Sequence, residues 1–224
     1  MSSKPKNYYT ECKKSKCHNP HYNTHKIELP FRAIIVGASG SGKSLCLLHL
    51  ISQMPDTFEE LIICCRSRDE PLYDLLSEKA KGMVTFYENT VPPLDEFKKE
   101  KKSRLIAFDD LVMSKKLNDV IAEYYLRSRK INMSCVYLTQ SWYQVPKFIR
   151  LNTTYIILKK ISSLRDLKMI IKEFALSMDI DDLLQLYKGI VSDGVTDFLM
   201  IDLVNPKLRY RHNLEPLEVK DELI

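Results

Sequence analysis

Residues 31–44 read Phe-Arg-Ala-Ile-Ile-Val-Gly-Ala-Ser-Gly-Ser-Gly-Lys-Ser, and this stretch decides the fold. The apolar run 31–36 predicts a strand, and residues 37–44 match G-x-x-x-x-G-K-[ST], a loop whose backbone N–H groups wrap a phosphate. Residues 45–54 predict a helix whose N-terminus adds positive potential there. The stretch therefore predicts a nucleotide-phosphate site. Its expected binding residues are Gly37, Ala38, Ser39, Gly40, Ser41, Gly42, Lys43, Ser44 and Leu45.

Further apolar runs of strand length follow, and several are continuously apolar, as expected for strands covered on both faces of a parallel sheet. They are residues 61–65, 83–87, 105–108, 134–138 and 155–158. Between them, residues 118–129 and 164–174 predict helices, the second with Ser163 and Asp166 as a capping pair. The pattern predicts an α/β fold with a mostly parallel sheet and ligands at the carboxyl ends of its strands.

Composition and charge narrow the class of protein. The chain has 224 residues, 45% hydrophobic and 28% charged, which is ordinary for a soluble globular protein. No apolar run is long enough for a transmembrane helix and no secretory signal is visible, so we expect no membrane insertion and an intracellular location. The whole net charge of +5 arises in residues 1–26, where six lysines face Glu11 alone. This basic arm suits an acidic partner such as nucleic acid, or is a solvated tail.

The arm also gathers thiols and imidazoles, the groups that bind zinc: Cys12, Cys17, His18, His21 and His25. Their spacing matches no established zinc pattern. A polar, disordered arm is the favoured interpretation, with a zinc site as the alternative.

Two acids end the run 105–108 and suggest hydrolysis. Asp109 is the candidate to hold Mg²⁺, and Asp110 is the candidate to orient or deprotonate an attacking water. Lys43 would reach the β- and γ-phosphates, and Ser44 would place its hydroxyl on Mg²⁺. The alternative is that the two acids only cap the following turn.

The strand 134–138 is a candidate for insertion between the phosphate-loop strand and the acidic strand. Gln140 would then lie near the γ-phosphate, as a sensor or a water-positioning group, or would merely be hydrogen-bonded at a strand end. Upstream, Arg127 and Arg129 are candidates to enter a neighbouring subunit's site, where a guanidinium stabilises transition-state charge. Alternatively they complement the helix macrodipole.

Residues 137–150, Tyr-Leu-Thr-Gln-Ser-Trp-Tyr-Gln-Val-Pro-Lys-Phe-Ile-Arg, complete a distinctive set of motifs. Together with the phosphate loop and the paired acids, this run resembles the DNA-packaging ATPases of large DNA viruses of the poxvirus type, their virophage and transposon relatives, within the FtsK/HerA superfamily. The resemblance covers about residues 31–204. It implies a P-loop NTPase of the additional-strand, RecA/FtsK-like type.

Carried over by position, the resemblance implies that Lys43 and Ser44 bind ATP and Mg²⁺ and that Asp109 and Asp110 are the acidic pair. Gln140 is then the sensor and Arg129 the preferred trans-acting arginine, with Arg127 and Arg150 as substitutes. Many relatives have Glu where this chain has Asp110, and the shorter side chain makes the water-activating role less secure than the metal role of Asp109.

The implied activity is ATP-driven translocation of double-stranded DNA into a preformed capsid by a homo-oligomeric ring of five or six subunits that hydrolyses ATP at subunit interfaces. Capsid or portal-vertex proteins are the implied partners. The implied locations are the host cytoplasm or viral factory and the virion.

Residues 1–27 would be the basic arm, residues 28–212 the ATPase domain and residues 213–224 a tail. Trp142 and Tyr143 suit a subunit interface or the core. Candidate contacts to DNA backbone phosphates are the arm, Lys98, Lys99, Lys101, Lys102, Lys207, Arg209 and Arg211.

Three other readings stay open. Another DNA-translocating ATPase or helicase of the same superfamily would share every motif. A nucleotide kinase would share the phosphate loop but needs an arginine-rich lid, which is not evident. An ATP-binding assembly factor would have little use for Asp110.

Overall fold

The computed structural model describes residues 8, 17–111, 115–175, 178–192 and 194–218 as an α/β fold built on one sheet. Its strands are β1 (Arg32–Val36), β2 (Glu60–Cys65), β3 (Val84–Glu88), β4 (Arg104–Asp109), β5 (Met133–Thr139), β6 (Tyr155–Leu158), β7 (Leu199–Asp202), β8 (Tyr210–His212) and β9 (Glu215–Pro216). Its helices are α1 (Tyr22–His25), α2 (Lys43–Ser52), α3 (Pro71–Lys79), α4 (Lys115–Arg127), α5 (Lys147–Leu151), α6 (Leu164–Phe174) and α7 (Ile180–Ser192). The 3₁₀ turns are η2 (Leu94–Phe97), η3 (Ser128–Ile131) and η4 (Pro206–Leu208).

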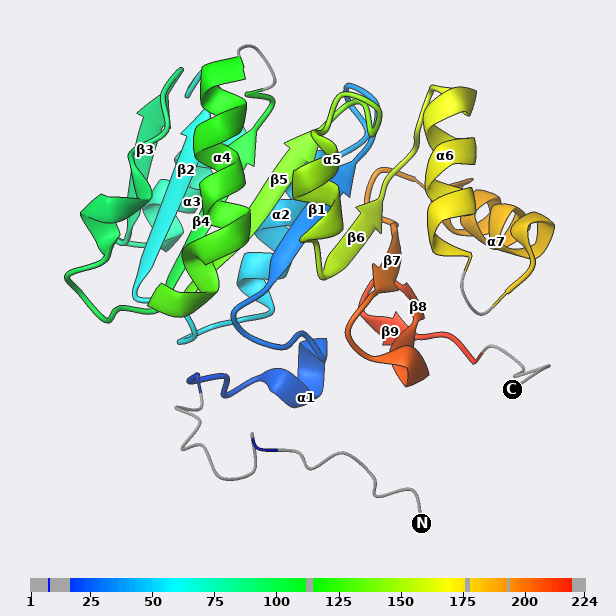
Figure 1. Ribbon diagram of the computed structural model, residues 1–224, viewed down its shortest axis with the longest axis horizontal. Helices are drawn as coiled ribbons and strands as arrows, with labels where there is room; N and C mark the ends of the chain where they lie inside the picture. The colour runs from blue at the N-terminus through cyan, green and yellow to red at the C-terminus, as the bar shows by residue number, and fades with distance from the viewer. Residues whose placement is uncertain (1–7, 9–16, 112–114, 176–177, 193, 219–224) are drawn as a thin grey trace.

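The strand order is β3-β2-β4-β5-β1-β6-β7-β8-β9 (Figure 1). The first six strands of this order are parallel, and β7, β8 and β9 continue the sheet in antiparallel fashion. β5 lies between β1 and β4, which confirms the predicted insertion. Since parallel strands end at one edge, this order brings the loops after β1, β4 and β5 together.

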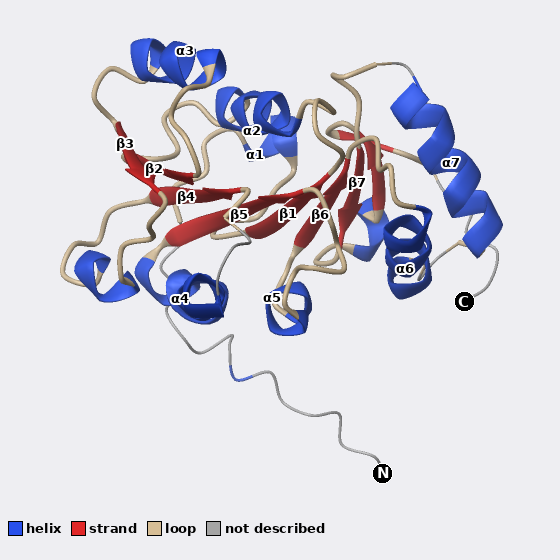
Figure 2. Ribbon diagram, turned by 90° about the horizontal axis from the view of Figure 1, so that it is seen from above, coloured by secondary structure: helices blue, strands red, loops and turns tan. Residues whose placement is uncertain are grey.

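Helices cover both faces of the sheet (Figure 2). Side chains of α2 and α3 pack on one face with Ala33 and Ile35 of β1, whereas side chains of α5, α6 and α7 pack on the other with Ile34 and Val36. Alternate residues of β1 therefore enter two different cores, as the period of a strand requires. Burial on both faces explains why β1, β2 and β4 are continuously apolar in sequence.

The six predicted strands and the three predicted helices are present, with bounds that differ by at most about three residues. α6 begins and ends where predicted, and the Ser163 side chain accepts a hydrogen bond from the Asp166 N–H, as expected of the cap. The three antiparallel strands were not predicted. β9 also places residues 213–216, assigned to the tail, in a hairpin with β8.

The end of the basic arm packs against the body of the protein. The fully buried Arg211 donates to the carbonyl oxygens of His25, at 3.0 Å, and Lys26, at 3.1 Å, and forms an ion pair with Asp202, which is also fully buried. The prediction that Arg211 contacts DNA is therefore wrong, because its guanidinium is used inside the protein. The Arg209 guanidinium also has a partner within the protein, because it donates to the Asp202 carbonyl oxygen at 2.8 Å.

Within the described ranges, no helix has the length and apolar character that a bilayer crossing requires.

Candidate functional site

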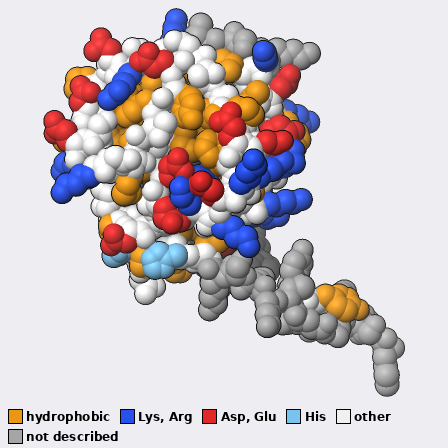
Figure 3. Space-filling model, turned by 90° about the vertical axis from the view of Figure 1, so that its left-hand side faces the viewer, with side chains coloured by type: hydrophobic (Ala, Val, Ile, Leu, Met, Phe, Trp, Pro, Cys, Tyr) orange, Lys and Arg blue, Asp and Glu red, His pale blue; other side chains and the backbone are white. Residues whose placement is uncertain are grey.

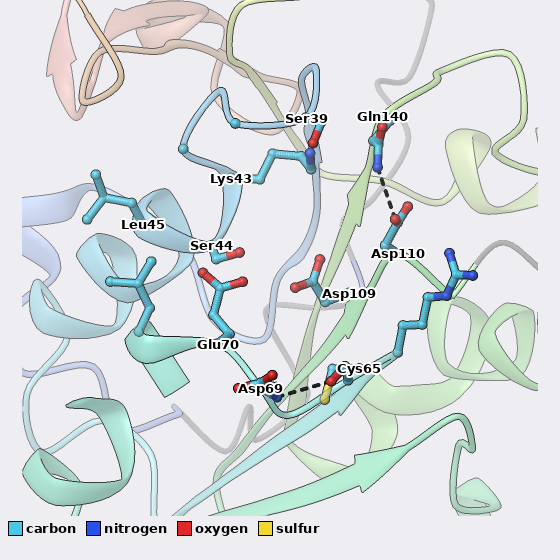
Figure 4. Close-up of a pocket in the computed structure, with 15 residues that line it drawn as sticks. Ser39, Lys43, Ser44, Leu45, Cys65, Asp69, Glu70, Asp109, Asp110 and Gln140 are labelled. Carbon is cyan, nitrogen blue, oxygen red and sulfur yellow. Dashed lines mark hydrogen bonds between the residues drawn. The ribbon is translucent and has the colours of Figure 1, made fainter. Parts of the chain in front are cut away.

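A cavity of about 470 Å³ opens at the carboxyl edge of the parallel strands (Figure 4). It brings together most of the residues selected from sequence: Ser39, Gly40, Gly42, Lys43, Ser44, Leu45, Asp109, Asp110 and Gln140. These come from the loop after β1, the start of α2 and the ends of β4 and β5. The remaining predicted binding residues, Gly37, Ala38 and Ser41, lie in the same loop.

The phosphate loop is held in shape by the ends of the neighbouring strands. The Gly37 N–H donates to the Thr139 carbonyl oxygen at 3.1 Å, and the Ala38 N–H donates to the Lys160 carbonyl oxygen at 2.8 Å. Gly42 has a φ of 84°, and a Cβ there would lie 2.4 Å from the Val195 carbonyl oxygen. Both the backbone conformation and the close approach therefore require glycine.

Lys159 lies directly after β6 and packs against the phosphate loop. Its side chain is buried, and its ammonium donates to the carbonyl oxygens of Val195 at 2.6 Å and Asp197 at 2.8 Å. A Cβ on Gly37 would lie 2.6 Å from the Cβ of Lys159. Lys159 thus joins the segment before β7 to the back of the phosphate loop.

Several donors of the loop remain available to a ligand. Within the described residues, the backbone N–H groups of Gly40, Gly42, Lys43 and Ser44 have no backbone acceptor, as expected at a helix N-terminus. The buried Ser41 hydroxyl also has no hydrogen-bond partner there. Unpaired donors of this kind around a glycine-rich turn fit phosphate oxygens.

Lys43 spans the loop. Its ammonium donates to the carbonyl oxygens of Gly37 and Ala38, both at 3.0 Å. Burial lowers the pKa of Lys43, while the nearby carboxylates of Asp109, Asp110 and Glu70 act in the opposite direction. Its cationic form suits a polyanionic ligand at the cavity.

Asp109, at the end of β4, accepts a hydrogen bond from the hydroxyl of Tyr73. Burial raises the pKa of Asp109, and the hydrogen bond from Tyr73 and the charge of Lys43 partly offset this. Together with the Ser44 hydroxyl and Asp110, it supplies hard oxygen donors, the chemistry that Mg²⁺ prefers. The donor set therefore fits a magnesium–nucleotide complex.

Asp110 faces Gln140 across the ends of β4 and β5 (Figure 4). The Gln140 side-chain amide donates to the Asp110 carboxylate at 3.0 Å, and the Asp110 N–H donates to the Leu138 carbonyl oxygen at 3.2 Å. The positions predicted for the acid and the sensor are thus in direct contact. This contact follows from the insertion of β5 beside β4.

The loop after β5 is fastened to α6. The buried Asp166 carboxylate accepts hydrogen bonds from the N–H groups of Trp142, at 3.1 Å, and Tyr143, at 3.3 Å. The Trp142 indole N–H donates to Glu173 at 3.1 Å. Trp142 is fully buried and belongs to the core, whereas the exposed Tyr143 ring lies under the Arg165 guanidinium at 4.0 Å.

One wall of the cavity was missed by sequence analysis. It is formed by the end of β2 and the start of α3 and contributes Cys65, Arg66, Ser67, Asp69, Glu70 and Leu72. Tyr73 follows on the same helix. The only sequence signal is the place of these residues after an apolar strand, because a tyrosine on an amphipathic helix otherwise looks like a core residue.

The candidate arginines lie away from the cavity of their own chain. Arg129 is exposed in η3, before β5, and therefore at the opposite edge of the sheet. Arg127 forms an ion pair with Glu123 at 3.0 Å. Arg150 pairs with Glu173 at 2.7 Å and lies 5.4 Å from the Trp142 ring, so its contacts serve the loop after β5.

The candidate zinc ligands are only partly described, because Cys12 lies outside the described residues. Both ring nitrogens of the buried His25 have protein partners: one accepts from the Ile27 N–H at 3.0 Å, and the other lies 3.1 Å from the Asn19 side-chain oxygen. Burial lowers the pKa of His25 to about 4. Among the described residues, no three His, Cys, Asp or Glu side chains gather in a metal-binding cluster.

The lysines between η2 and β4 stay exposed, but acids lie among them. Lys98 pairs with Asp95, and Lys102 pairs with Glu100 at 2.8 Å. The face of the molecule at the β3 end of the sheet shows Lys and Arg side chains beside Asp and Glu side chains (Figure 3). This face is of mixed charge rather than uniformly basic.

Comparison with known proteins places the chain in a family. The model of the Poxvirus A32 protein family matches residues 20–201. The DNA packaging protein OPG160 of Monkeypox virus is 26% identical over 143 residues, which are 58% of this chain and 47% of that protein. The matched region thus spans about half of that relative's length.

Solved structures share the fold at low sequence identity. The DNA-packaging ATPase B204 of Sulfolobus Turreted Icosahedral Virus has a TM-score of 0.56 and 15% identity, over 86% of this chain and 100% of that one. The genome packaging NTPase B204 of Sulfolobus turreted icosahedral virus 2, bound to AMPPCP, has a TM-score of 0.58 and 16% identity, over 84% and 99%. The cytoplasmic domain of the Type VII secretion ATPase EccC of Thermomonospora curvata has a TM-score of 0.55 and 11% identity, over 79% of this chain and 24% of that one.

These likenesses confirm the α/β fold predicted from the phosphate loop and its strands. The family match, which includes the phosphate loop, the paired acids and residues 137–150, also confirms the resemblance inferred from those motifs. The chain belongs to the Poxvirus A32 protein family.

Proposed function

We propose that this chain hydrolyses ATP and uses the energy to drive double-stranded DNA into a viral capsid. The observation that carries the proposal is the contact of Gln140 with Asp110, beside Asp109 and across the cavity from Lys43. A protein that only bound nucleotide would need the phosphate loop but not this second carboxylate and its amide partner. The names of the relatives, a DNA packaging protein and a genome packaging NTPase solved with AMPPCP, support the same activity.

Binding uses the phosphate loop. The free N–H groups of Gly40, Gly42, Lys43 and Ser44 hold the phosphates, and the Lys43 ammonium leaves its loop carbonyl partners for the β- and γ-phosphate oxygens. Ser44 and Asp109 are the residues that would hold the Mg²⁺ that accompanies ATP. This ion, when bound, neutralises charge on the phosphate oxygens.

Hydrolysis uses Asp110. Its carboxylate accepts the proton of a water molecule as the water oxygen bonds to the γ-phosphorus and the bond to the ADP oxygen breaks. Gln140 holds one Asp110 oxygen at 3.0 Å and leaves the other for the water. In this proposal the γ-phosphate lies beside Asp110 and Gln140, so that its loss changes the surroundings of the Gln140 amide, which is the role of a sensor.

Coupling to DNA requires more than one copy. In a ring of five or six subunits, Arg129 of one copy reaches the nucleotide of the next, and DNA backbone phosphates contact basic residues of the arm together with Lys99 and Lys101. Capsid or portal-vertex proteins are the assembly partners, and the work takes place in the host cytoplasm or viral factory, with the motor retained in the virion. Arg127 is the substitute for Arg129, whereas Arg150 is engaged with Glu173.

The test is steady-state ATP hydrolysis by the purified chain, with and without long double-stranded DNA, beside its mass in solution. We expect turnover that DNA stimulates in a multi-subunit species, and Lys43→Ala should abolish it. Slow turnover by a monomer, indifferent to DNA even with capsid added, would contradict the proposal and favour a nucleotide kinase or an assembly factor.

A further inference from the structure

The first turn of α3 contributes a buried hydroxyl to the cavity wall. Tyr73 is 1% exposed, and its ring packs against Phe86 of β3 with the centroids 5.5 Å apart. Its hydroxyl donates to the Oδ2 atom of Asp109. A residue whose ring belongs to the core thus places its one polar side-chain atom on the carboxylate assigned to Mg²⁺.

The orientation of the Asp109 carboxylate depends on this hydrogen bond. Among the described residues, Tyr73 is the only hydrogen-bond donor to the Asp109 side chain, although Lys43 contributes an attractive charge. The terminal torsion of an aspartate is broad, so a carboxylate without a donor samples many orientations. A hydroxyl bonded to an ionised carboxylate is a strong, charge-assisted hydrogen bond that selects one of them.

The hydrogen bond also makes the two carboxylate oxygens of Asp109 unequal. Oδ2 is satisfied by protein, whereas Oδ1 has no donor among the described residues and stays available to a cation. Ser44, at the start of α2, and Glu70, at the start of α3, lie on the same side of the cavity (Figure 4). α3 therefore presents this wall to the place where a metal ion would accompany the phosphates.

We propose that Tyr73 is a positioning residue that orients Asp109 for Mg²⁺ and thereby sets the magnesium dependence of nucleotide binding. The inference rests on the proposed function. A purely structural role for Tyr73, as an anchor of α3, makes a different prediction, because the ring and not the hydroxyl packs against Phe86.

Tyr73→Phe keeps the ring and removes only the hydroxyl. The measurement is equilibrium binding of a fluorescent, non-hydrolysable ATP analogue at increasing Mg²⁺ concentration, with a parallel series in EDTA. We expect the Mg²⁺ concentration for half-maximal binding to rise about 10- to 150-fold, the loss that corresponds to one hydrogen bond to a charged group. Binding in EDTA should not change, because the phosphate loop is intact.

Tyr124→Phe is the matched control. Tyr124 is fully buried in α4, on the other face of the sheet, and its hydroxyl donates to the Pro92 carbonyl oxygen at 2.7 Å. The Tyr124→Phe variant loses a buried hydrogen bond away from the cavity. The Mg²⁺ dependence of its nucleotide binding should therefore match that of the wild-type chain. An equal shift in both variants would overturn the inference, because it would reflect general loosening.

An unchanged Mg²⁺ dependence in Tyr73→Phe would likewise overturn it. A wild-type chain that binds the analogue equally well with and without Mg²⁺ would overturn both this inference and the metal role proposed for Asp109. If binding depends on Mg²⁺ and shifts in the variant while hydrolysis stays indifferent to DNA, the proposed translocation fails and the role of Tyr73 stands.

Discussion

Asp110 has a backbone φ of 51°, in the left-handed region that aspartate and asparagine tolerate better than most residues. This conformation follows the last residue of β4 and turns the side chain toward Gln140. Aspartate adopts this conformation readily because its short polar side chain can hydrogen-bond locally.

Asp110→Asn is the sharpest test of this residue, because asparagine accepts the same backbone angle and its carbonyl oxygen still accepts the Gln140 hydrogen bond. Only the charge and the basicity are lost. We expect ATP to bind with unchanged affinity and single-turnover hydrolysis to fall by about 10²- to 10⁴-fold, the usual contribution of a general base.

Asp56→Asn is its control. Asp56 has a φ of 54° and is exposed outside the cavity, so the same substitution there should leave hydrolysis unchanged. Full turnover by Asp110→Asn would show that another group activates the water.

At the scale of elements, the segment around α1 is attached to the body through His25. Its folded pKa is lowered to about 4, because burial and the neighbouring positive charges of His21, Arg211 and Lys26 oppose protonation. The unfolded chain, with a pKa of about 6.5, takes up the proton first. The stability contributed by neutral His25 is therefore complete above about pH 6.5 and is lost as the pH falls toward 4.

We expect this linkage to remove about 2 kcal/mol of unfolding free energy between pH 7 and pH 5. Urea denaturation at both pH values, followed by circular dichroism, measures it. His25→Gln should be less stable at pH 7 but should lose about 2 kcal/mol less on acidification. His18→Gln, at an exposed position, should keep the wild-type pH dependence. Identical slopes for wild type and His25→Gln would contradict the assignment.

α6 stabilises the loop that carries Gln140. Asp166→Ala would leave the buried N–H group of Trp142 and the partly buried N–H group of Tyr143 without their acceptor, and we expect a loss of about 2–4 kcal/mol of unfolding free energy. Trp142 is the single tryptophan of the chain, so its emission during urea denaturation reports on this loop directly. The Trp142 emission of the Asp166→Ala variant should already be red-shifted before urea is added.

Asp181→Ala provides the comparison, because Asp181 is an exposed acid in the first turn of α7. It should cost less than about 1 kcal/mol, the usual size of a helix-dipole effect, and leave the emission unchanged. Equal losses in the two variants would mean that Asp166 acts only as a helix-terminal charge.

The elements differ in how far the sequence could predict them. Most of the parallel strands were predictable because burial on both faces makes them continuously apolar, whereas β3, at the edge of the sheet, is only partly buried. β7, β8 and β9 are short, and β8 contains Arg211, whose burial depends on Asp202 from a different strand. A local pattern cannot reveal such a partner, so Arg211 resembled a surface DNA contact.

The residues of the site also differ in how far the sequence could predict them. Lys43, Asp109, Asp110 and Gln140 could be predicted to meet, because each follows a strand of a parallel sheet and those strands end at one edge. Tyr73 and Glu70 belong to a helix that enters the cavity from the side. Their inclusion depends on how α3 packs on β2 and β3, which no spacing in the sequence encodes.

At the scale of the whole molecule, Arg129 and the cavity lie at opposite edges of the sheet. β5 lies between Arg129 and Gln140 in the chain. Its seven residues, with a rise of about 3.3 Å each, give the strand a length of roughly 20 Å. An arginine side chain cannot cross this distance. If Arg129 acts on a nucleotide at all, that nucleotide is bound by a neighbouring copy, and a single chain holds an incomplete site.

Complementation between two inactive variants tests this. Lys43→Ala keeps Arg129 but should not bind nucleotide, whereas Arg129→Ala keeps the cavity and should lose about 10³-fold or more in turnover. When equal amounts are mixed before assembly, the Arg129→Ala cavities that face a Lys43→Ala neighbour become complete. DNA-stimulated hydrolysis should then recover to about a quarter of the wild-type rate, as random mixing in a ring with one type of head-to-tail interface requires. Lys130→Ala, which removes an adjacent exposed charge, should be active without a partner. No recovery in mixed oligomers of confirmed mass would exclude Arg129 as the residue that completes the neighbouring site.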